Sequence, residues 1–258
     1  MRTATLPILM IMVASLSVLA GCADREKITT YEQLDGKRFA VPTGTVADKL
    51  VESRFPKATF LYFNTVLDAA IAVKTGKADV AAYDEPILKN IAARNPGLTV
   101  LPRNITTDEY GFAVRLTDQE LKDAVDSVIT AVRASGEYQQ MMDRWLPAQG
   151  DPQPMPAIPT GGEGVLRFGT AAVTEPFSFV DASSATVGMD VEFAARTAAR
   201  LGRRLEIVNM EFGALIPALI AGKVDMIGAC ITITEERRKS VLFSMPYYTG
   251  GIAALVRQ

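Results

Sequence analysis

Two stretches of the chain decide its fold: residues 69–80 (AAIAVKTGKADV) and residues 215–227 (LIPALIAGKVDMI). Each has the pattern of a helix that ends at a glycine, followed by Lys-x-Asp and an apolar strand. A single match proves little, because glycine is the favoured residue just after a helix. Two matches at corresponding points of two α/β patterns predict a pair of similar lobes.

Apolar runs and helical patterns alternate outward from both stretches, which is typical of βα units that build largely parallel sheets. In the N-terminal half we expect strands at 38–41, 59–62, 80–83 and 98–101, and helices at 46–54, 65–75 (opened by Asn64) and 85–94. In the C-terminal half we expect strands at 166–170, 205–209, 226–227 and 253–256, and helices at 191–201, 214–221 and 234–239. Two open α/β sheets that face each other share one crevice between their strand-end loops, where ligands of such folds collect.

Two further helices and a linker separate the halves. Residues 118–135 predict an amphipathic helix, because apolar side chains recur at spacings of three and four: Leu121, Val125, Val128, Ile129 and Val132. A second helix is expected at 136–146. Residues 147–164 contain five prolines and four glycines, which predicts a linker without regular structure.

The composition excludes several classes of function. The formal net charge is -2, and no long run of Lys and Arg is present to neutralise phosphates, so we expect no nucleic-acid partner. Among 258 residues there is no histidine, the commonest metal ligand and general base. We therefore expect neither a metal nor a cofactor, and no imidazole-based catalysis.

The N-terminus has the layout of a secretory signal. Arg2 precedes an apolar stretch at 6–19, and the small residues Ala20 and Gly21 precede Cys22. Residues 19–22 resemble a bacterial lipobox, which implies lipidation of Cys22 and anchoring on a membrane surface. The alternative is an ordinary signal peptide that ends near a cysteine. Cys230 is the only other cysteine, so a lipidated chain has no intramolecular disulfide.

Several motifs together resemble one family, the amino-acid-binding extracytoplasmic solute-binding proteins of ABC importers (bacterial family 3). The motifs of its first lobe are Pro176-Phe177-Ser178-Phe179, Phe212, Ile216-Pro217, Gly222-Lys223-Val224-Asp225, Thr232-Ile233-Thr234, Arg237 and Tyr247-Tyr248. Those of its second lobe are Leu34-Asp35-Gly36-Lys37, Gly44-Thr45, Asp79-Val80, Asp84 and Tyr110-Gly111. The resemblance implies an α/β fold of the two-lobe type 2 periplasmic-binding-protein kind, with a hinge.

The family's first lobe comes second in this chain, so the resemblance implies a circular permutant. The expected division is a signal peptide (1–21), a lipidated tether (22–27), lobe 2 (28–109), one hinge strand with helices that pack on lobe 1 (110–146), the linker (147–164) and lobe 1 (165–258). The hinge strand is expected around 111–115. An exchange of lobes between two chains is the rival topology; we expect a monomer.

The resemblance also assigns roles to residues. Arg237 would hold the ligand's α-carboxylate through its planar guanidinium, helped by Gly44 and Thr45 at a helix start. Its alternative role is that of a solvated arginine in the charged run 235–239. Asp84 would accept hydrogen bonds from the ligand's ammonium, unless it serves as a helix cap, and Thr45 has the same alternative.

Other residues would complete the ligand site. Thr232 and the backbone of Cys230 would share the ammonium with Asp84, while the Cys230 thiol would serve as a small packing group. Phe212 and Phe177 are candidates for apolar walls, although Phe177 fits a core position equally well. Ala171 stands where many relatives have an aspartate, which argues against a basic ligand. Thr174 stands where many have an aromatic ring, and its loss leaves space or adds polarity.

The expected function is capture of an amino acid or similar zwitterion for an ABC permease, in the periplasm or at the cell surface. Closure of the lobes around the ligand would be the mechanism. One rival is a dehydratase of cyclic carboxylic acids on the same fold, for which Glu175, Glu211 and Asp84 are the candidate acids. Another rival is a module that senses a ligand for a membrane partner.

Overall fold

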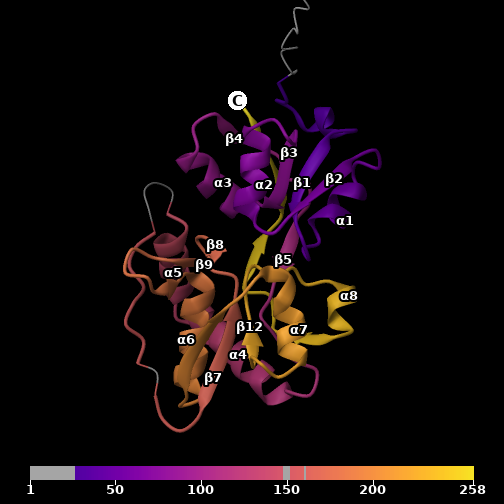
Figure 1. Ribbon diagram of the computed structural model, residues 1–258. Helices are drawn as coiled ribbons and strands as arrows, with labels where there is room; N and C mark the ends of the chain where they lie inside the picture. The colour runs from indigo at the N-terminus through magenta and orange to yellow at the C-terminus, as the bar shows by residue number, and fades with distance from the viewer. Residues whose placement is uncertain (1–26, 148–151, 160) are drawn as a thin grey trace, which may run out of the picture.

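The computed structural model describes residues 27–147, 152–159 and 161–258. The signal segment, Cys22 and part of the linker lie outside the described residues. Two lobes lie one above the other in Figure 1, with lobe 2 in indigo and purple and lobe 1 in magenta to yellow. Within the described ranges, no helix combines the length and the apolar character needed to cross a bilayer.

Lobe 2 is built on a five-stranded sheet with the order β2-β1-β3-β15-β4. Its strands are β1 (Arg38–Pro42), β2 (Thr59–Phe63), β3 (Val80–Asp84), β4 (Leu98–Val100) and β15 (Ile252–Arg257). Its helices are η1 (Tyr31–Leu34), α1 (Ala47–Glu52), α2 (Val66–Lys74) and α3 (Glu85–Arg94). The strands β1, β2 and β3 are parallel, as the alternation of strands and helices predicts.

Lobe 1 has a second five-stranded sheet with the order β11-β7-β12-β6-β13. Its strands are β6 (Ala113–Arg115), β7 (Val165–Thr170), β11 (Arg204–Asn209), β12 (Met226–Ile227) and β13 (Val241–Phe243). Its helices are α4 (Gln119–Ala134), α5 (Glu137–Trp145), α6 (Met189–Arg200), η2 (Phe212–Ala214), α7 (Leu215–Ile220) and α8 (Glu235–Arg238). A small sheet of β8 (Val173–Thr174), β9 (Ser178–Val180) and β10 (Thr186–Val187) adjoins them.

The two main sheets have equivalent strand orders, and in each the fourth strand is antiparallel and arrives from the other lobe. In lobe 1 this strand is β6, and in lobe 2 it is β15, drawn in yellow where it rises into the upper lobe of Figure 1. Before crossing, the chain forms β5 (Asp108–Tyr110) and β14 (Tyr248–Gly250), which pair antiparallel. The hinge therefore has two crossing segments, which corrects the prediction of a single hinge strand.

The placement of the last strand in lobe 1 is also wrong. Leu255 of β15 pairs with both Ala81 of β3 and Val100 of β4. Five of its six residues are buried, which suits a central strand covered on both faces. The apolar run could not reveal which sheet it joins, because either sheet has room for such a strand.

The aspartate of each Gly-Lys-x-Asp turn pairs with an arginine at the start of a neighbouring strand, a contact called here the Arg-Asp clasp. In lobe 2, Arg38 donates from its backbone N and Nε to Asp79 Oδ2 (3.1 and 3.0 Å) and from Nη2 to Oδ1 (2.9 Å). In lobe 1, Arg167 makes the same three bonds to Asp225, at 3.0, 3.0 and 2.7 Å. The repeat in the sequence therefore encodes a repeated contact that ties the start of one strand to the start of its neighbour.

We expect Asp225→Asn to destabilise the protein by about 2 kcal/mol, because the carboxylate accepts several charge-assisted hydrogen bonds. Burial raises the Asp225 pKa, but hydrogen bonds from Arg167 and Arg115 outweigh it, so the pKa lies below the usual 3.8. A lowered pKa contributes stability above 3.8 that is lost as the pH falls through the folded-state pKa. Urea unfolding at a series of acidic pH values measures the difference in unfolding free energy between wild type and variant. This difference should shrink as the pH falls below 3.8. A difference that stays constant would contradict the stabilising role of the Asp225 carboxylate.

A few local features differ from expectation. The second helix is opened by Thr65, whose hydroxyl accepts a hydrogen bond from the Asp68 amide (3.1 Å), rather than by Asn64. Strands β5, β8, β9, β10, β13 and β14 were not predicted. Each has only two or three residues, too few to show a hydrophobic period.

Candidate ligand-binding site

A small cavity lies where the two lobes meet, at the carboxyl ends of parallel strands. Its volume is about 10 Å³, and its lining residues come from both lobes: Thr45, Val46, Ala47, Tyr83, Asp84, Phe212, Cys230, Thr232, Arg237 and Ile252. A neighbouring cavity of about 30 Å³ shares Phe212 and Arg237 and adds Gly44. The folded chain thus brings together seven of the eight residues expected to bind a ligand.

Arg237 enters this cavity from α8. Its four neighbours in the charged run are exposed, whereas Arg237 is only partly accessible. Its Nη1 donates to the carbonyl of Thr232 (2.9 Å), its Nη2 donates to the carbonyl of Gly44 in the other lobe (3.3 Å), and its guanidinium lies 5.6 Å from the centre of the Phe212 ring. Burial lowers the pKa of Arg237, but arginine remains charged. The alternative of a freely solvated arginine is therefore wrong.

Asp84 ends β3 on the opposite side of the cavity, and its side chain is 4% exposed. It makes no capping bond to α3 and instead accepts a short hydrogen bond from the Tyr110 hydroxyl. Burial raises the Asp84 pKa to about 7, although Tyr110 and Arg237 act against this rise. Asp84 is thus a poorly solvated acid that would gain from a cationic partner.

Gly44 and Thr45 form the turn between β1 and α1. Gly44 has a φ of +80°, and a Cβ at this position would lie 2.7 Å from the Cα of Gly213, so only glycine permits this close approach of the two lobes. The Thr45 hydroxyl donates to the carbonyl of Pro42 (2.9 Å) and accepts from the Ala47 amide (3.3 Å). Thr45 therefore satisfies a backbone amide at the start of α1 and also lines the cavity.

Cys230 and Thr232 line the ligand cavity and belong to the loop that follows β12. Cys230 has a φ of +52°, and its amide donates to Asp190 Oδ2 (3.1 Å). Burial raises the thiol pKa well above its usual value, so the thiol stays protonated and unreactive. Among the described residues, no group of three or more Cys, Asp or Glu side chains is arranged to hold a metal ion.

Phe177 is the one expected ligand residue that does not reach the cavity. It is fully buried and packs edge-on against the rings of Tyr110 and Tyr248, at centroid distances of 6.3 and 5.1 Å. Four lining residues, Val46, Ala47, Tyr83 and Ile252, were not expected from the sequence, nor were Tyr110 and Asp190 as partners of lining groups. No local pattern signals them, because their neighbours are set by strand pairing.

Two α/β lobes joined by two crossing segments, with a cavity lined from both, define a two-lobe α/β fold. Residues 166–258 match the family model of bacterial extracellular solute-binding proteins, family 3. ABC transporter arginine-binding protein 1 of Escherichia coli (strain K12) is 27% identical over 130 residues, 48% of this chain and 54% of that protein. The arginine-bound form of domain 1 from TmArgBP is 45% identical, covering 37% of this chain and 81% of that chain, with a TM-score of 0.33.

A different kind of relative matches most of the chain. Virulence sensor protein BvgS of Bordetella pertussis (strain Tohama I) is 26% identical over 242 residues, which cover 87% of this chain and 19% of that protein. Because 87% exceeds the share of either lobe, the match includes residues of both halves of this chain. The chain spans about half of the arginine-binding protein and about a fifth of the sensor.

Proposed function

We propose that this protein captures an amino acid or a similar small zwitterion between its two lobes. The observation that carries the proposal is that Arg237 from lobe 1 and Asp84 from lobe 2 both line one cavity. A guanidinium suits a carboxylate, and a buried carboxylate suits an ammonium, so a zwitterion satisfies both charges at once.

Lobe closure would couple binding to a change of shape. The cavity of about 10 Å³ between the closed lobes is smaller than an amino acid, so the ligand would have to enter while the lobes are apart. Because the ligand contacts both lobes only when they meet, its binding energy favours the closed arrangement. A membrane permease could then distinguish the loaded protein by its shape.

Export, lipidation at Cys22 and delivery to an ABC permease complete the proposal, together with a monomeric, circularly permuted lobe order. The lipobox-like residues 19–22 support the anchor, and the relatives named as ABC transporter binding proteins support the permease. Sizing chromatography tests the monomer, since an exchange of lobes would double the mass.

The ligand test is a thermal-shift panel of amino acids, small peptides and opines. A ligand at about 100 times its dissociation constant should add about 2.7 kcal/mol to the free energy of unfolding. Stabilisation by one chemical group of these compounds would support the proposal and identify the ligand class. If no compound of the panel raises the melting temperature, amino-acid capture is the wrong assignment.

Affinity should increase with pH, because the ammonium requires the Asp84 carboxylate. With the Asp84 pKa raised to about 7 by burial, the free protein holds a proton there below this pH and must release it on binding. We expect affinity to rise about tenfold per pH unit below that pKa and to level off above it. Calorimetry in buffers of different ionisation enthalpy would detect the released proton, and Asp84→Asn should bind weakly with a flat pH profile. Equal affinity on both sides of the pKa would refute this role.

The second candidate is a sensing module, which the long match to a virulence sensor favours. Both candidates need the same ligand cavity, so the discriminating measurement is in cells. Deletion of an import component should abolish uptake of the ligand identified above, whereas deletion of a sensor should leave uptake intact and change gene expression. For the dehydratase alternative, Asp84 is the only one of the three candidate acids that lines the cavity, and product formation from prephenate or arogenate would be its test.

A further inference from the structure

The turn between β8 and β9 of lobe 1 reaches across to α3 of lobe 2. Arg94 near the end of α3 donates from both terminal nitrogens to the two carboxylate oxygens of Glu175, with 2.6 Å between Nη2 and Oε1. Asn90, one helical turn earlier, donates from Nδ2 to the carbonyl of Glu175 (3.5 Å). Both polar groups of Glu175 that can accept hydrogen bonds are therefore engaged by one face of α3.

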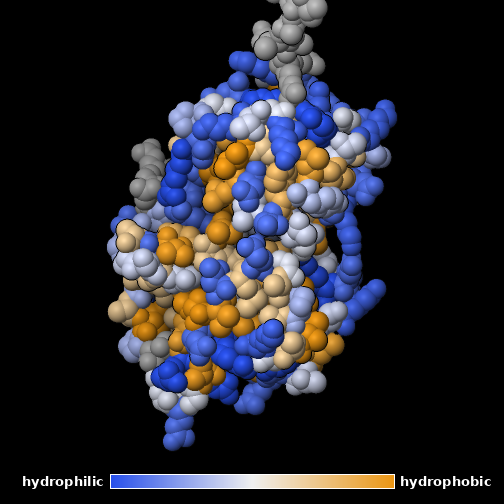
Figure 2. All heavy atoms as spheres, in the orientation of Figure 1, coloured by the Kyte–Doolittle hydropathy of each residue, from blue (hydrophilic) through white to orange (hydrophobic). Residues whose placement is uncertain are grey.

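The Glu175 pair is partly protected from water. The Glu175 side chain is 17% exposed and that of Arg94 is 48% exposed. Next to it lies an interlobe cavity of about 240 Å³, whose apolar lining residues are Leu67, Ile87, Ile91, Ala172, Val173, Phe179 and Val180. Figure 2 shows apolar side chains on the visible face along the boundary between the lobes. Because the Glu175 side chain is only 17% exposed, this ion pair is screened less than a pair in open solvent.

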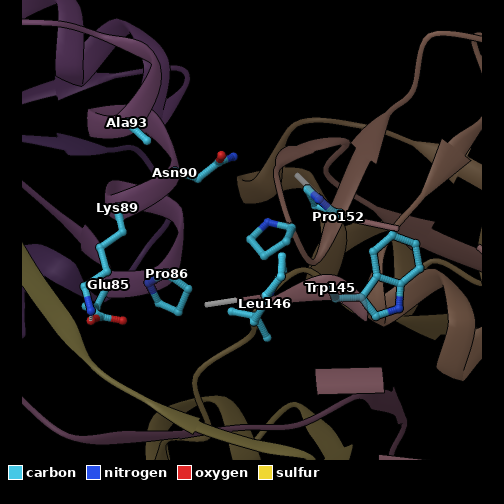
Figure 3. A pocket seen from close by; sticks show the side chains of 10 residues that line it. Glu85, Pro86, Lys89, Asn90, Ala93, Trp145, Leu146 and Pro152 are labelled. Atoms are coloured by element: carbon cyan, nitrogen blue, oxygen red, sulfur yellow. Dashed lines mark ion pairs between the residues drawn. The ribbon is translucent and has the colours of Figure 1, made fainter. Parts of the chain in front are cut away.

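In the described part of the chain, the hydrogen bonds of Arg94 and Asn90 to Glu175 link α3 to lobe 1 on this flank. A larger cavity of about 470 Å³ follows on the other side of Asn90. Figure 3 shows Pro86 and Asn90 of α3 on one side of this cavity and Leu146 and Pro152 on the other, while Lys89 turns back toward Glu85.

A second ion pair joins the lobes on the opposite flank of the ligand cavity. Lys49 of α1 lies 2.6 Å from Glu236 of α8, but their side chains are 64% and 71% exposed. Pairs this exposed contribute little to the stability of a contact. The chain therefore offers one partly buried interlobe pair and one exposed interlobe pair, which form a matched comparison.

We propose that Arg94 and Glu175 form a latch that stabilises the closed arrangement of the lobes and thereby sets the affinity for the ligand. The affinity effect rests on the function proposed above, whereas the effect on lobe separation does not. The two-bond geometry of the pair exists only when the lobes meet, so its free energy is differential between open and closed forms. Any such difference shifts the population of the closed form before the ligand arrives.

The first test measures ligand affinity. We expect Glu175→Gln and Arg94→Gln each to weaken binding about fivefold, and the charge-swapped double variant Arg94→Glu/Glu175→Arg to recover most of the loss. The control Glu236→Gln, on the exposed flank, should change affinity by less than about twofold. If the charge-swapped variant recovers affinity, the effect comes from the ion pair and not from the packing of the two side chains. Equal effects of Glu175→Gln and Glu236→Gln, or no rescue, would overturn the proposal.

The second test requires no ligand. Spin labels on cysteines introduced at the exposed Lys57 of lobe 2 and Lys223 of lobe 1, with Cys22 replaced by serine, report the separation of the lobes. In Glu175→Gln we expect the distance distribution to broaden toward longer distances, and in Glu236→Gln to stay as in the wild type. An unchanged distribution in Glu175→Gln rules out the latch even if an amino acid binds. If no compound of the thermal-shift panel binds, amino-acid capture is ruled out, and the spin-label distances alone then test the latch.

Discussion

Replacing Arg237 with methionine should weaken binding of the ligand found in the panel by about 100-fold or more, since the ligand carboxylate would lose a charged two-bond partner in a poorly solvated cavity. Methionine retains much of the side-chain length that packs beside Phe212. The loss should therefore reflect the guanidinium rather than a new void. Isothermal titration with the wild type and the variant measures the effect directly.

Arg238 provides the control on the same short helix. It is exposed and pairs with Glu235 at 3.4 Å rather than with a group of the cavity. Arg238→Met should bind the ligand as the wild type does, and both variants should keep the wild-type circular dichroism spectrum. If Arg237→Met retains full affinity while folded, the carboxylate is held elsewhere and the site is wrongly assigned.

The largest effect on stability is expected for Glu192→Ala, about 3–5 kcal/mol of unfolding free energy. Glu192 is fully buried on α6 and accepts hydrogen bonds from Arg144 (3.0 Å), Arg196 (3.0 Å) and the Trp145 indole (2.7 Å). Removing the carboxylate leaves two arginines without their buried partner and the indole donor unsatisfied. Because Arg144 and Trp145 belong to α5, the same change weakens the attachment of α5 to α6.

Glu235→Ala is the matched control, since its side chain is 93% exposed and pairs only at the surface. It should change the unfolding free energy by less than about 0.5 kcal/mol. Urea denaturation followed by tryptophan fluorescence is the suitable measurement, because Trp145 is the only tryptophan of the chain and contacts Glu192. A loss below about 1 kcal/mol for Glu192→Ala would mean that water solvates the site.

Much of the fold could be predicted because the deciding signals are local. The helix over 85–94 was predicted with its observed bounds, since Pro86 suits its first turn and Asn95-Pro96-Gly97 follows its end. The repeat of Gly-Lys-x-Asp predicted two similar lobes, and each aspartate proves to make the same clasp. The helix bounds and the Gly-Lys-x-Asp motif depend on residues close together in the sequence, whereas each clasp joins residues 41 or 58 positions apart.

The candidate site was harder to predict than the helices. Arg237 and Asp84 came from a family resemblance, since the charged run 235–239 alone favoured a solvated arginine. The structure separates the two readings, because only Arg237 of this run lies in the cavity lining. Phe177 could not be excluded from the sequence, because an aromatic residue suits a core and a ligand wall equally well.

By itself, the amino-acid sequence determined the alternation of strands and helices, the two-lobe α/β class and the residue types available for a zwitterion. Only the tertiary structure decided that β15 returns to lobe 2, that the hinge has two crossing segments and that Glu175 meets Arg94 across the lobes. The physical reason is distance along the chain. Periodicity and turn chemistry act between neighbours, whereas strand partners and interlobe ion pairs join residues that many choices of pairing could bring together.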